Sequence, residues 1–383
     1  MTRNAVILGA LRTPIGKNNG ALKDFHPVAL LARMLQELIA RTGVDPELVE
    51  DHITGCVGQV GEQSVNIARS AVLAAGLPIT IPGVTIDRQC GSSQQAIHFA
   101  AQAVMSGTMN LVVASGVESM SRIPIGSQTG DNLFAPFAPV AEQGIEIVHQ
   151  GVSAEMVAKQ WNLTREELDR FSLRSHAMAA TAEDAGYFAS QRVPVGFLSW
   201  DEGVRRDTSL EALAKLKPSF QADGMVTPGN SSQIADGAGA LLIADETWAR
   251  GHGFVPRARI ASLSVVGSDP TLMLTGVIPA TQKVLRNGQL YLPLSAIDVV
   301  EINEAFASVV LAWKKELNVS DEWFEDHVNP NGGAIAHGHP LGASGAILMT
   351  KLLHELERRD GKWGLQTMCE GGGMANATVI ERL

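Results

Sequence analysis

Short apolar segments alternate with segments of helical periodicity, and the same order occurs twice along this 383-residue chain. The first series predicts alternating strands and helices over residues 5–9, 27–41, 51–57, 63–75, 84–87, 90–105 and 111–114. The second predicts them over residues 258–266, 280–286, 298–302, 305–316, 340–357 and 365–369. Such alternation is typical of a layered α/β fold with a largely parallel sheet, so we expect two topologically similar halves.

A long segment of different character separates the two series. It contains irregular stretches and a helix expected at 163–182, which the capping box from Thr164 to Glu167 opens. A strand at 236–244 then returns to the first half. The predicted domains are a first half at 1–117 completed by 233–253, an inserted loop domain at 118–232, and a second half at 254–383. A long insertion in a compact fold is usually functional.

Charge and cysteine content restrict the class of partner. The net charge of −10 argues against nucleic acid, although a local basic patch is enough to bind a small anion. Three scattered cysteines without metal-ligand spacing fit a reducing compartment and no metal site. Neither a leader pattern nor an apolar run long enough to span a membrane is present, and the ending ERL is not a peroxisomal signal. We therefore expect a cytoplasmic protein that does not bind membranes.

Cys90 is the first candidate for chemistry. It lies in DRQCGSS, where a strand ends and a helix is expected to begin. A helix N-terminus carries partial positive charge, which favours a thiolate and predicts a lowered pKa for this cysteine. Gly91 allows a substrate to approach the backbone. A buried structural cysteine is an equally good interpretation of this segment alone.

His339 lies in GHPLGASG, directly before a proline. Pro340 suits the first position of a helix, and the residue before a proline is held extended, which leaves the imidazole free to point into a cleft. A metal pair of His337 and His339 is the weaker interpretation, because no third ligand is evident.

Two further motifs are ambiguous on their own. Cys369 precedes three glycines in MCEGGGMA, which indicates exposed N–H groups that could bind an anion, or simply a hairpin turn. Asn303 in EINEAFA lies at another expected junction of strand and helix, where it could cap the helix or orient a water molecule.

Taken together, the segments CGS, NEAF, GHP and CxG, in this order and spacing, resemble the thiolase family closely from Arg12 to the C-terminal strand. The resemblance implies duplicated βαβαβαββ halves in an α/β sandwich with an inserted loop domain. It also implies that Cys90 is the nucleophile, His339 its base and Cys369 a second acid/base. Asn303, through a water, and His339 would form one oxyanion hole. The N–H groups of Cys90 and Gly371 would form the other.

The implied activity is that of an acyl-CoA C-acetyltransferase. Such an enzyme cleaves 3-oxoacyl-CoA reversibly with CoA through an acyl-cysteine, and it holds no permanently bound cofactor. Its partners are CoA and acyl-CoA, and a homodimer or homotetramer is expected. The chemistry is coherent, because the α-carbon of acetyl-CoA is a poor acid whose deprotonation needs a base beside an oxyanion hole.

The resemblance also implies a set of contacts to CoA and the thioester. Arg205 aligns with a basic residue near the nucleotide, although the adjacent Arg206 leaves the register open. The other implied contacts are Phe220, Ser232, His149, Met273 and Ala305. Roles without any contact to CoA are also possible: Phe220 could be an ordinary core residue, and Arg205 could be a solvated surface charge.

Some positions depart from the usual family pattern. Gln150 stands where the family often has Met in the acyl pocket, and Ser93 replaces a common Gly. The runs GEQS at 61–64 and SQQA at 93–96 are similar to thiolases of steroid side-chain degradation. Lipid or steroid side-chain degradation is therefore the expected setting.

Three alternatives remain. A 3-oxoacyl synthase of the same fold would lack the second cysteine, which Cys369 argues against. A non-catalytic CoA-binding relative would be expected to lose a catalytic position, and all four are present. A thiol redox sensor would need a second cysteine near Cys90, which sequence alone cannot place.

Overall fold

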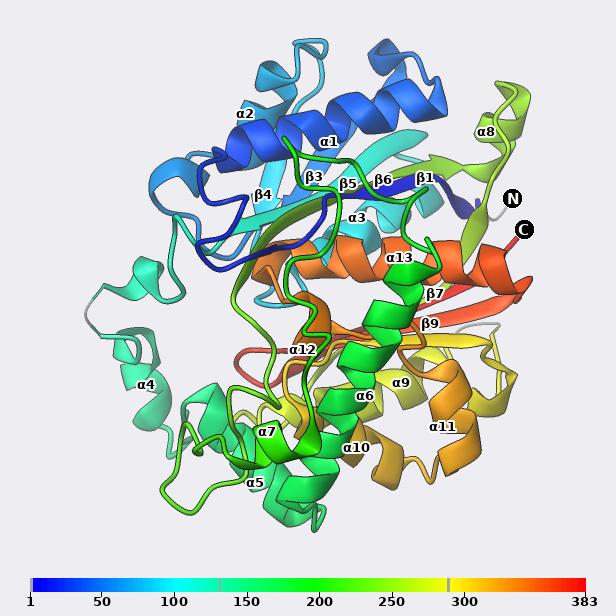
Figure 1. Ribbon diagram of the computed structural model, residues 1–383. Helices are drawn as coiled ribbons and strands as arrows, with labels where there is room; N and C mark the ends of the chain where they lie inside the picture. The colour runs from blue at the N-terminus through cyan, green and yellow to red at the C-terminus, as the bar shows by residue number, and fades with distance from the viewer. Residues whose placement is uncertain (1–2, 131, 288–289) are drawn as a thin grey trace.

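The computed structural model describes residues 3–130, 132–287 and 290–383 (Figure 1). Its strands form one sheet in the order β4-β3-β5-β6-β1-β7-β10-β9-β8, with the short β2 paired to β6. The strands are β1 Ala5–Arg12, β2 Gly16–Lys17, β3 Asp51–Gly55, β4 Val84–Ile86, β5 Leu111–Ser119, β6 Ala235–Asp245, β7 Ala258–Gly267, β8 Val299–Ile302, β9 Trp363–Glu370 and β10 Met374–Arg382.

The two halves repeat one topology, as expected. In the first, β4, β3 and β5 are parallel, whereas β6 and β1 are antiparallel to their neighbours. In the second, β8 and β9 are parallel, and β10 and β7 follow antiparallel. A parallel bridge from Val300 to Val328 takes the place that β4 has in the first half. The seam between the halves is narrow, because β1 pairs with β7 only at Val6–Arg259 and Ile7–Ala258.

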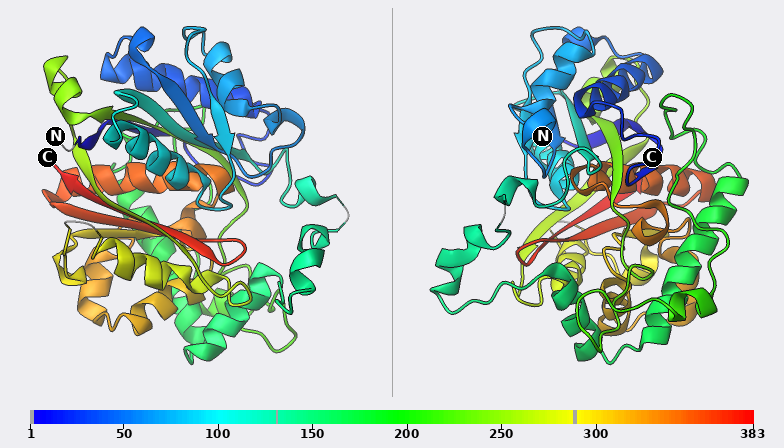
Figure 2. Two further views of the ribbon diagram at one scale, coloured as in Figure 1. Left: turned by 180° about the vertical axis from the view of Figure 1, so that it is seen from behind. Right: turned by 60° about the vertical axis from the view of Figure 1, so that its left-hand side comes forward.

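Helices form three layers around this sheet. The principal ones are α1 Pro27–Thr42, α2 Ile67–Ala74, α3 Ser92–Met105, α9 Val277–Val284, α10 Ala307–Glu316 and α13 Ser344–Arg359. In Figure 1, α1 and α2 cover the outer face of the first half, and α9 and α10 cover that of the second. The helices α3 and α13 lie between the two halves of the sheet. The left view of Figure 2, which is seen from behind, shows the same central pair.

α3 is buried along most of its length and carries no charged side chain, whereas the charged residues of α13 begin only at Lys351, after a buried apolar first half. Their close approach depends on Gly345, because a Cβ there would overlap the backbone of Gln94. Small side chains such as Ala96, Ala100 and Ala346 complete the shared core. This layer positions the N-termini of α3 and α13, which the CGS turn and the GHP loop precede.

The chain between β5 and β6 forms the inserted segment. It contains α4 Ala138–Ala141, α5 Gln150–Gln160, α6 Arg165–Asp184 and α7 Leu210–Ala214. The predicted capping box is present at the start of α6, where Thr164 accepts from the backbone of Glu167 and the Glu167 side chain accepts from Thr164. α6 packs against α10 and against α12 Ala334–His337 (Figure 1). The domain boundaries given above stay predictions.

Two expected helices begin later than the sequence predicts. Val65 and Asn66 have φ values of 55° and 59°, so the helix expected from residue 63 starts as α2 only at Ile67. The expected helix start at Pro340 is wrong. Pro340 is extended, a 3-10 turn spans Leu341–Ala343, and α13 begins at Ser344. Within the described residues, no helix is both long and apolar enough to cross a membrane.

Candidate active site

Cys90 lies where the chain turns from β4 into α3. The turn is tight, because Gln89 has a positive φ of 49° and Gly91 is the N-cap. Cys90 is 6% exposed and clusters with Leu348 and Met368, against which Leu341 packs. The CGS turn, the GHP loop and the end of β9 therefore meet around this sulfur.

The expected lowering of the Cys90 pKa is wrong for this structure. Burial, and next the negative charge of Glu370, raise the pKa of the Cys90 thiol to about 12, against a lowering effect from a hydrogen bond with the Gln150 side chain. Desolvation of the charged form therefore outweighs the helix N-terminus. Cys90 is a neutral thiol near pH 7, so a thiolate forms only when a base takes its proton.

His339 is buried and its ring is held at both nitrogens. Nδ1 lies 2.6 Å from Ser344 Oγ, which itself donates to the Pro340 carbonyl at 3.1 Å. The Ser344 hydroxyl has one proton, so it accepts from Nδ1–H and leaves Nε2 unprotonated. Asn303 Nδ2 lies 3.4 Å from that Nε2. Burial lowers the His339 pKa to about 4, so the imidazole is neutral at pH 7 and able to accept a proton.

A buried carboxylate on β5 anchors the GHP loop. Glu118 accepts from the backbone N–H groups of Gly342 at 2.8 Å, Val57 at 2.9 Å and Gly58 at 3.0 Å. These bonds join the loop that follows β3 to the turn that follows His339. The orientation of His339 is therefore set by both halves of the molecule.

A second buried carboxylate anchors the NEAF segment. Glu304 accepts from Ser175 Oγ at 2.6 Å, Asn329 Nδ2 at 2.9 Å and the Ile335 N–H at 3.1 Å. Ser175 belongs to α6, so the same carboxylate links the inserted segment to the strand end that carries Asn303. Asn303 itself donates from its backbone to Thr367, and its Oδ1 has no partner among the described residues.

Cys369 lies near the end of β9. Burial, and next the charge of Cys90, raise the Cys369 pKa well above its ordinary value, so the two thiols are within electrostatic reach of each other. Gly371 follows in the turn to β10 and lies beside Gln89. The hairpin interpretation of the three glycines is correct, since β9 and β10 pair up to Glu370–Met374. All three cysteines are free thiols.

The residues expected at the thioester and pantetheine lie around the start of α5. Phe220 stacks on His149 with ring centroids 5.1 Å apart, and it leaves no room for a Cβ on Gly151. The backbone N–H of Ser232 donates to Ala305 at 2.9 Å.

A second contact joins α5 to the turn at Met273. Ser153 on α5 donates to the Thr271 carbonyl at 2.7 Å. Met273 itself is buried with a φ of 51°. The NEAF segment, α5 and this turn therefore enclose one side of the site.

The two neighbouring arginines differ in their partners. Arg206 makes two bonds of 2.8 Å to Asp184. The Arg205 side chain is exposed and forms no ion pair with any residue in the described ranges, while its backbone N–H donates to His176. Arg205 is therefore the better placed of the two to meet an anion.

A metal role for the histidine pair finds no support. His337 Nδ1 lies 3.1 Å from Asp201, which also pairs with Arg12 at 2.8 Å, and His337 Nε2 lies 2.9 Å from the Asn331 carbonyl. Within the part of the chain that is described, no group of three metal-ligating side chains occurs. His337 therefore belongs to a structural ion-pair network.

Sequence reasoning missed Ser344 and Glu370, and it placed Gln150 in the acyl pocket without linking it to Cys90. Ser344 is part of the GHP motif, but only the late start of α13 shows that it faces His339. Gln150 stood out in the sequence only because the family often has Met at this position, and no sequence pattern pointed to Glu370. Ser344 could have been found by asking which residue of the GHPLGAS segment can bond to the His339 ring. The position of Glu370 beside Cys90 is evident only from the tertiary fold.

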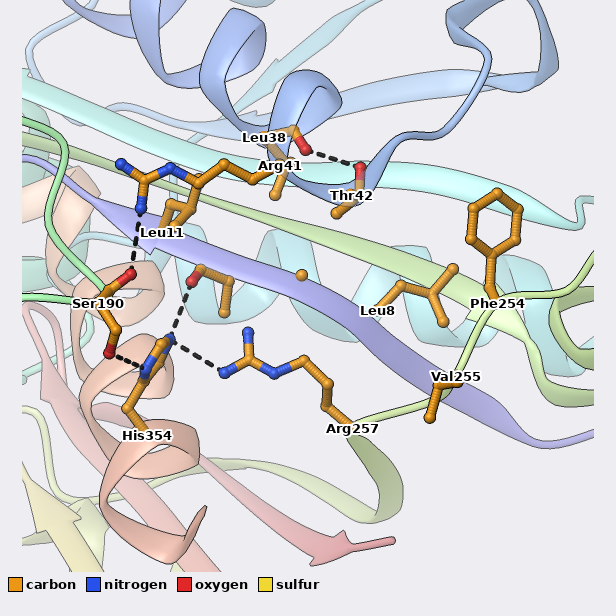
Figure 3. A pocket seen from close by; sticks show the side chains of 12 residues that line it. Leu8, Leu11, Leu38, Arg41, Thr42, Ser190, Phe254, Val255, Arg257 and His354 are labelled. Carbon is orange, nitrogen blue, oxygen red and sulfur yellow. Dashed lines mark hydrogen bonds between the residues drawn. The ribbon is translucent and has the colours of Figure 1, made fainter. Parts of the chain in front are cut away.

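A cavity of about 280 Å³ lies elsewhere, between α1, β1 and α13 (Figure 3). Arg41, Arg257 and His354 line it, but none of the predicted site residues does. Its cations already have partners, because Arg257 pairs with Glu357 and Arg41 binds the Ser190 carbonyl. The cavity is therefore separate from the chemistry described above.

Comparisons with known proteins identify the family of the chain. The family model for the thiolase N-terminal domain matches residues 5–247, and that for the C-terminal domain matches residues 254–382. A steroid 3-ketoacyl-CoA thiolase of Mycobacterium tuberculosis is 50% identical, over 99% of this chain and 94% of that protein. A 3-oxoadipyl-CoA/3-oxo-5,6-dehydrosuberyl-CoA thiolase of Escherichia coli is 42% identical over 100% of both chains.

A solved structure is similar over nearly its whole length. The acetyl-CoA acetyltransferase of Bacillus anthracis superimposes with a TM-score of 0.90 at 41% identity, covering 100% of this chain and 99% of that one. The expected fold of duplicated halves and the expected acyltransferase activity are thereby confirmed. The chain belongs to the thiolase family and is a thiolase, an acyltransferase of the 3-oxoacyl-CoA class.

Proposed function

We propose that Cys90 is the nucleophile of this thiolase, with His339 and Cys369 as its two proton carriers. The neutral imidazole of His339 takes the thiol proton of Cys90. The thiolate then attacks the 3-oxo carbon of the substrate, and the bond between the α- and β-carbons breaks. The acyl group remains on Cys90, and the acetyl-CoA carbanion takes a proton from Cys369.

The second half-reaction uses the same groups in reverse order. The CoA thiol gives its proton to the Cys369 thiolate and attacks the acyl-cysteine, and Cys90 leaves as a thiolate that takes back the proton held by His339. Asn303, through a water, and His339 serve one oxyanion, and the N–H groups of Cys90 and Gly371 serve the other. Donors of this kind stabilise the charge that develops in the transition state.

One observation carries this assignment. The chain from Ser344 through His339 to Asn303 fixes an unprotonated Nε2, and the GHP loop packs against the cluster that holds Cys90. A thiol with a pKa of about 12 needs such a base, because little thiolate forms unaided at pH 7. Burial keeps His339 neutral over the whole neutral range, so its Nε2 lone pair is free to accept that proton, and the imidazolium formed beside the thiolate would stabilise it.

For the contacts to CoA we propose Arg205 near the nucleotide, with Phe220 and Ser232 along the pantetheine and adenine. His149, Met273 and Ala305 would line the thioester end. We further propose that the enzyme works in the cytoplasm as a homodimer or homotetramer, without a permanently bound cofactor. The Arg205 side chain, which has no ion-pair partner among the described residues, fits the proposed nucleotide contact. The free thiols fit the proposed cytoplasmic setting. Light scattering that gives the mass of one 40.6-kDa chain would contradict the oligomer.

The substrate class that we propose is a 3-oxoacyl-CoA with a steroid-derived acyl group. The high identity to a steroid thiolase over almost the whole chain supports this choice. A thiolysis screen tests it, with linear 3-oxoacyl-CoA of increasing length, 3-oxoadipyl-CoA and a polycyclic 3-oxoacyl-CoA, and with Cys90→Ala as the blank. The polycyclic substrate should give the highest kcat/KM. A preference for short linear chains or for the dicarboxylic substrate would refute the steroid assignment.

A further inference from the structure

Glu370 is a buried acid that the proposed reaction does not use. It is the last residue of β9 and directly follows Cys369. The side chain is fully buried, and neither carboxyl oxygen has a hydrogen-bond partner among residues 3–130, 132–287 and 290–383. A buried carboxylate without hydrogen-bond donors from the protein is disfavoured, so this setting favours the neutral acid.

The carboxyl group packs against the turn that carries the nucleophile. A Cβ built on Gly91 would overlap Glu370 Oε1, so the carboxyl occupies the space where that side chain would lie. Gly91 follows Cys90 directly and is the N-cap of α3. A negative charge on Glu370 raises the pKa of both Cys90 and Cys369, which shows that both sulfurs are within its electrostatic reach.

Other charged groups act on the same acid. Burial raises the pKa of Glu370 to about 8, while Arg88 opposes the shift and Asp87 adds to it. Arg88 and Asp87 both belong to the turn before α3 and are unchanged by a substitution at Glu370. From β9, Cys369 keeps its proton because its pKa lies well above the ordinary thiol value. Across the site, His339 is neutral at every pH above its pKa of about 4.

We propose that Glu370 is a positioning residue for the nucleophile: it is kept as a neutral acid beside Gly91, and its ionisation opposes the thiolate of Cys90. Below the point at which Glu370 ionises, the thiol faces an uncharged neighbour. Above it, the new carboxylate repels the thiolate, so the thiolate fraction rises less steeply with pH than for an isolated thiol. The catalytic consequence rests on the proposed role of Cys90 as nucleophile.

The test is the rate of Cys90 alkylation by iodoacetamide as a function of pH, followed by peptide mapping, in the full-length enzyme and in Glu370→Gln. The ratio of the variant rate to the parent rate should be about 1 near pH 6.5 and about three to ten near pH 9.5, as expected for a coupling of roughly half to one pKa unit. Glu47→Gln, which removes an exposed carboxylate elsewhere, is the matched control and should give a ratio near one throughout.

A ratio that does not change with pH would overturn the proposal, whether its value is one or a constant produced by altered packing. If Glu370→Gln does not fold, the parent protein alone decides. Its logarithmic alkylation rate should rise with a slope below one above about pH 8, because two coupled groups titrate together, and a slope of one throughout would overturn the idea. Mapping reports Cys90 reactivity independently of turnover. A failure of the proposed function would instead appear as thiolysis that survives Cys90→Ala.

Discussion

Asn303 Nδ2 lies 3.4 Å from Nε2 of His339, on the side of the ring opposite to the bond with Ser344. This contact brings the NEAF and GHP motifs together at the atom that we propose as the base. It also fixes the tautomer of His339, with the proton on Nδ1, because an amide N–H can only donate and therefore requires an unprotonated Nε2. A helix-cap role for Asn303 is excluded by the fold, since α10 begins four residues later at Ala307.

Asn303→Ala should lower kcat strongly, with little change in the KM for CoA. An oxyanion contact acts mainly in the transition state, and loss of one such donor typically costs about 10²–10³-fold in kcat. Steady-state thiolysis kinetics at varied CoA concentration measure both constants. A rise in KM with kcat unchanged would show that Asn303 contributes only to substrate binding.

Ser344→Ala should lower kcat by about tenfold or more, because Nδ1 loses its acceptor and the tautomer of His339 is no longer fixed. Ser344→Thr keeps a hydroxyl and should restore much of the rate. The pH profile of kcat separates this role from simple packing, since only the alanine variant should show an altered acidic limb. Identical profiles for parent and alanine variant would contradict the proton order described above.

Cys369→Ala and Cys90→Ala should differ when each is incubated with acetyl-CoA. Acetyl transfer needs the Cys90 thiol and His339, whereas condensation needs a second acetyl-CoA that loses a proton to Cys369. Cys369→Ala should therefore gain one acetyl group on the Cys90 peptide and form no acetoacetyl-CoA, and Cys90→Ala should gain none. Intact-protein mass spectrometry with peptide mapping decides. Acetylation of Cys369, or condensation by Cys369→Ala at the parent rate, would reverse the assignment.

Arg205→Ala should raise the KM for CoA several-fold at low salt, with kcat nearly unchanged. Its unpaired guanidinium is available to an anionic ligand, and such a contact weakens with ionic strength. Arg206→Ala is the matched control, because Asp184 already holds that side chain. A larger effect from Arg206 would move the nucleotide contact by one residue.

Stability should fall as the pH drops from about 6.5 toward 4. Burial lowers the pKa values of His52 and His339 to about 4 and that of His98 to about 3. The unfolded chain, with imidazole pKa values near 6.5, binds these protons first, so the stabilisation is complete above that pH and is lost below it. Urea midpoints at several pH values measure the slope, which His98→Gln should flatten and the exposed-site control His26→Gln should not. A midpoint independent of pH over this window would contradict the prediction.

Gly345→Ala should destabilise the fold by about 1–3 kcal/mol, the usual effect of overpacking. The new methyl would overlap the backbone of Gln94, which cannot move without displacing α3. Gly251→Ala is the control, since a Cβ there meets nothing within 4 Å. Thermal unfolding of both variants checks the difference, and equal melting temperatures would show that the two helices can separate without loss.

The sequence predicted elements whose causes are local and missed features whose causes are tertiary. Alternation of apolar segments and the capping box at Thr164 were sufficient for the duplicated halves and for α6. The helix start at Pro340 was wrong, because the loop is instead shaped by Glu118 on a distant strand. The direction of the Cys90 pKa shift was wrong for a similar reason, since burial and Glu370 come from residues remote in sequence.

The position of β6 has a consequence for how the protein is made. This strand lies in the sheet between β5 and β1, although more than a hundred residues of inserted chain precede it in synthesis. Until residue 245 has left the ribosome, β1 and β5 both present open edges, and α3 has no completed sheet to pack on. The helix that follows Cys90 therefore acquires its final environment late, after the inserted segment has emerged. A chain that stops before Ala235 would expose two aggregation-prone strand edges and would leave the turn at Cys90 without its completed sheet.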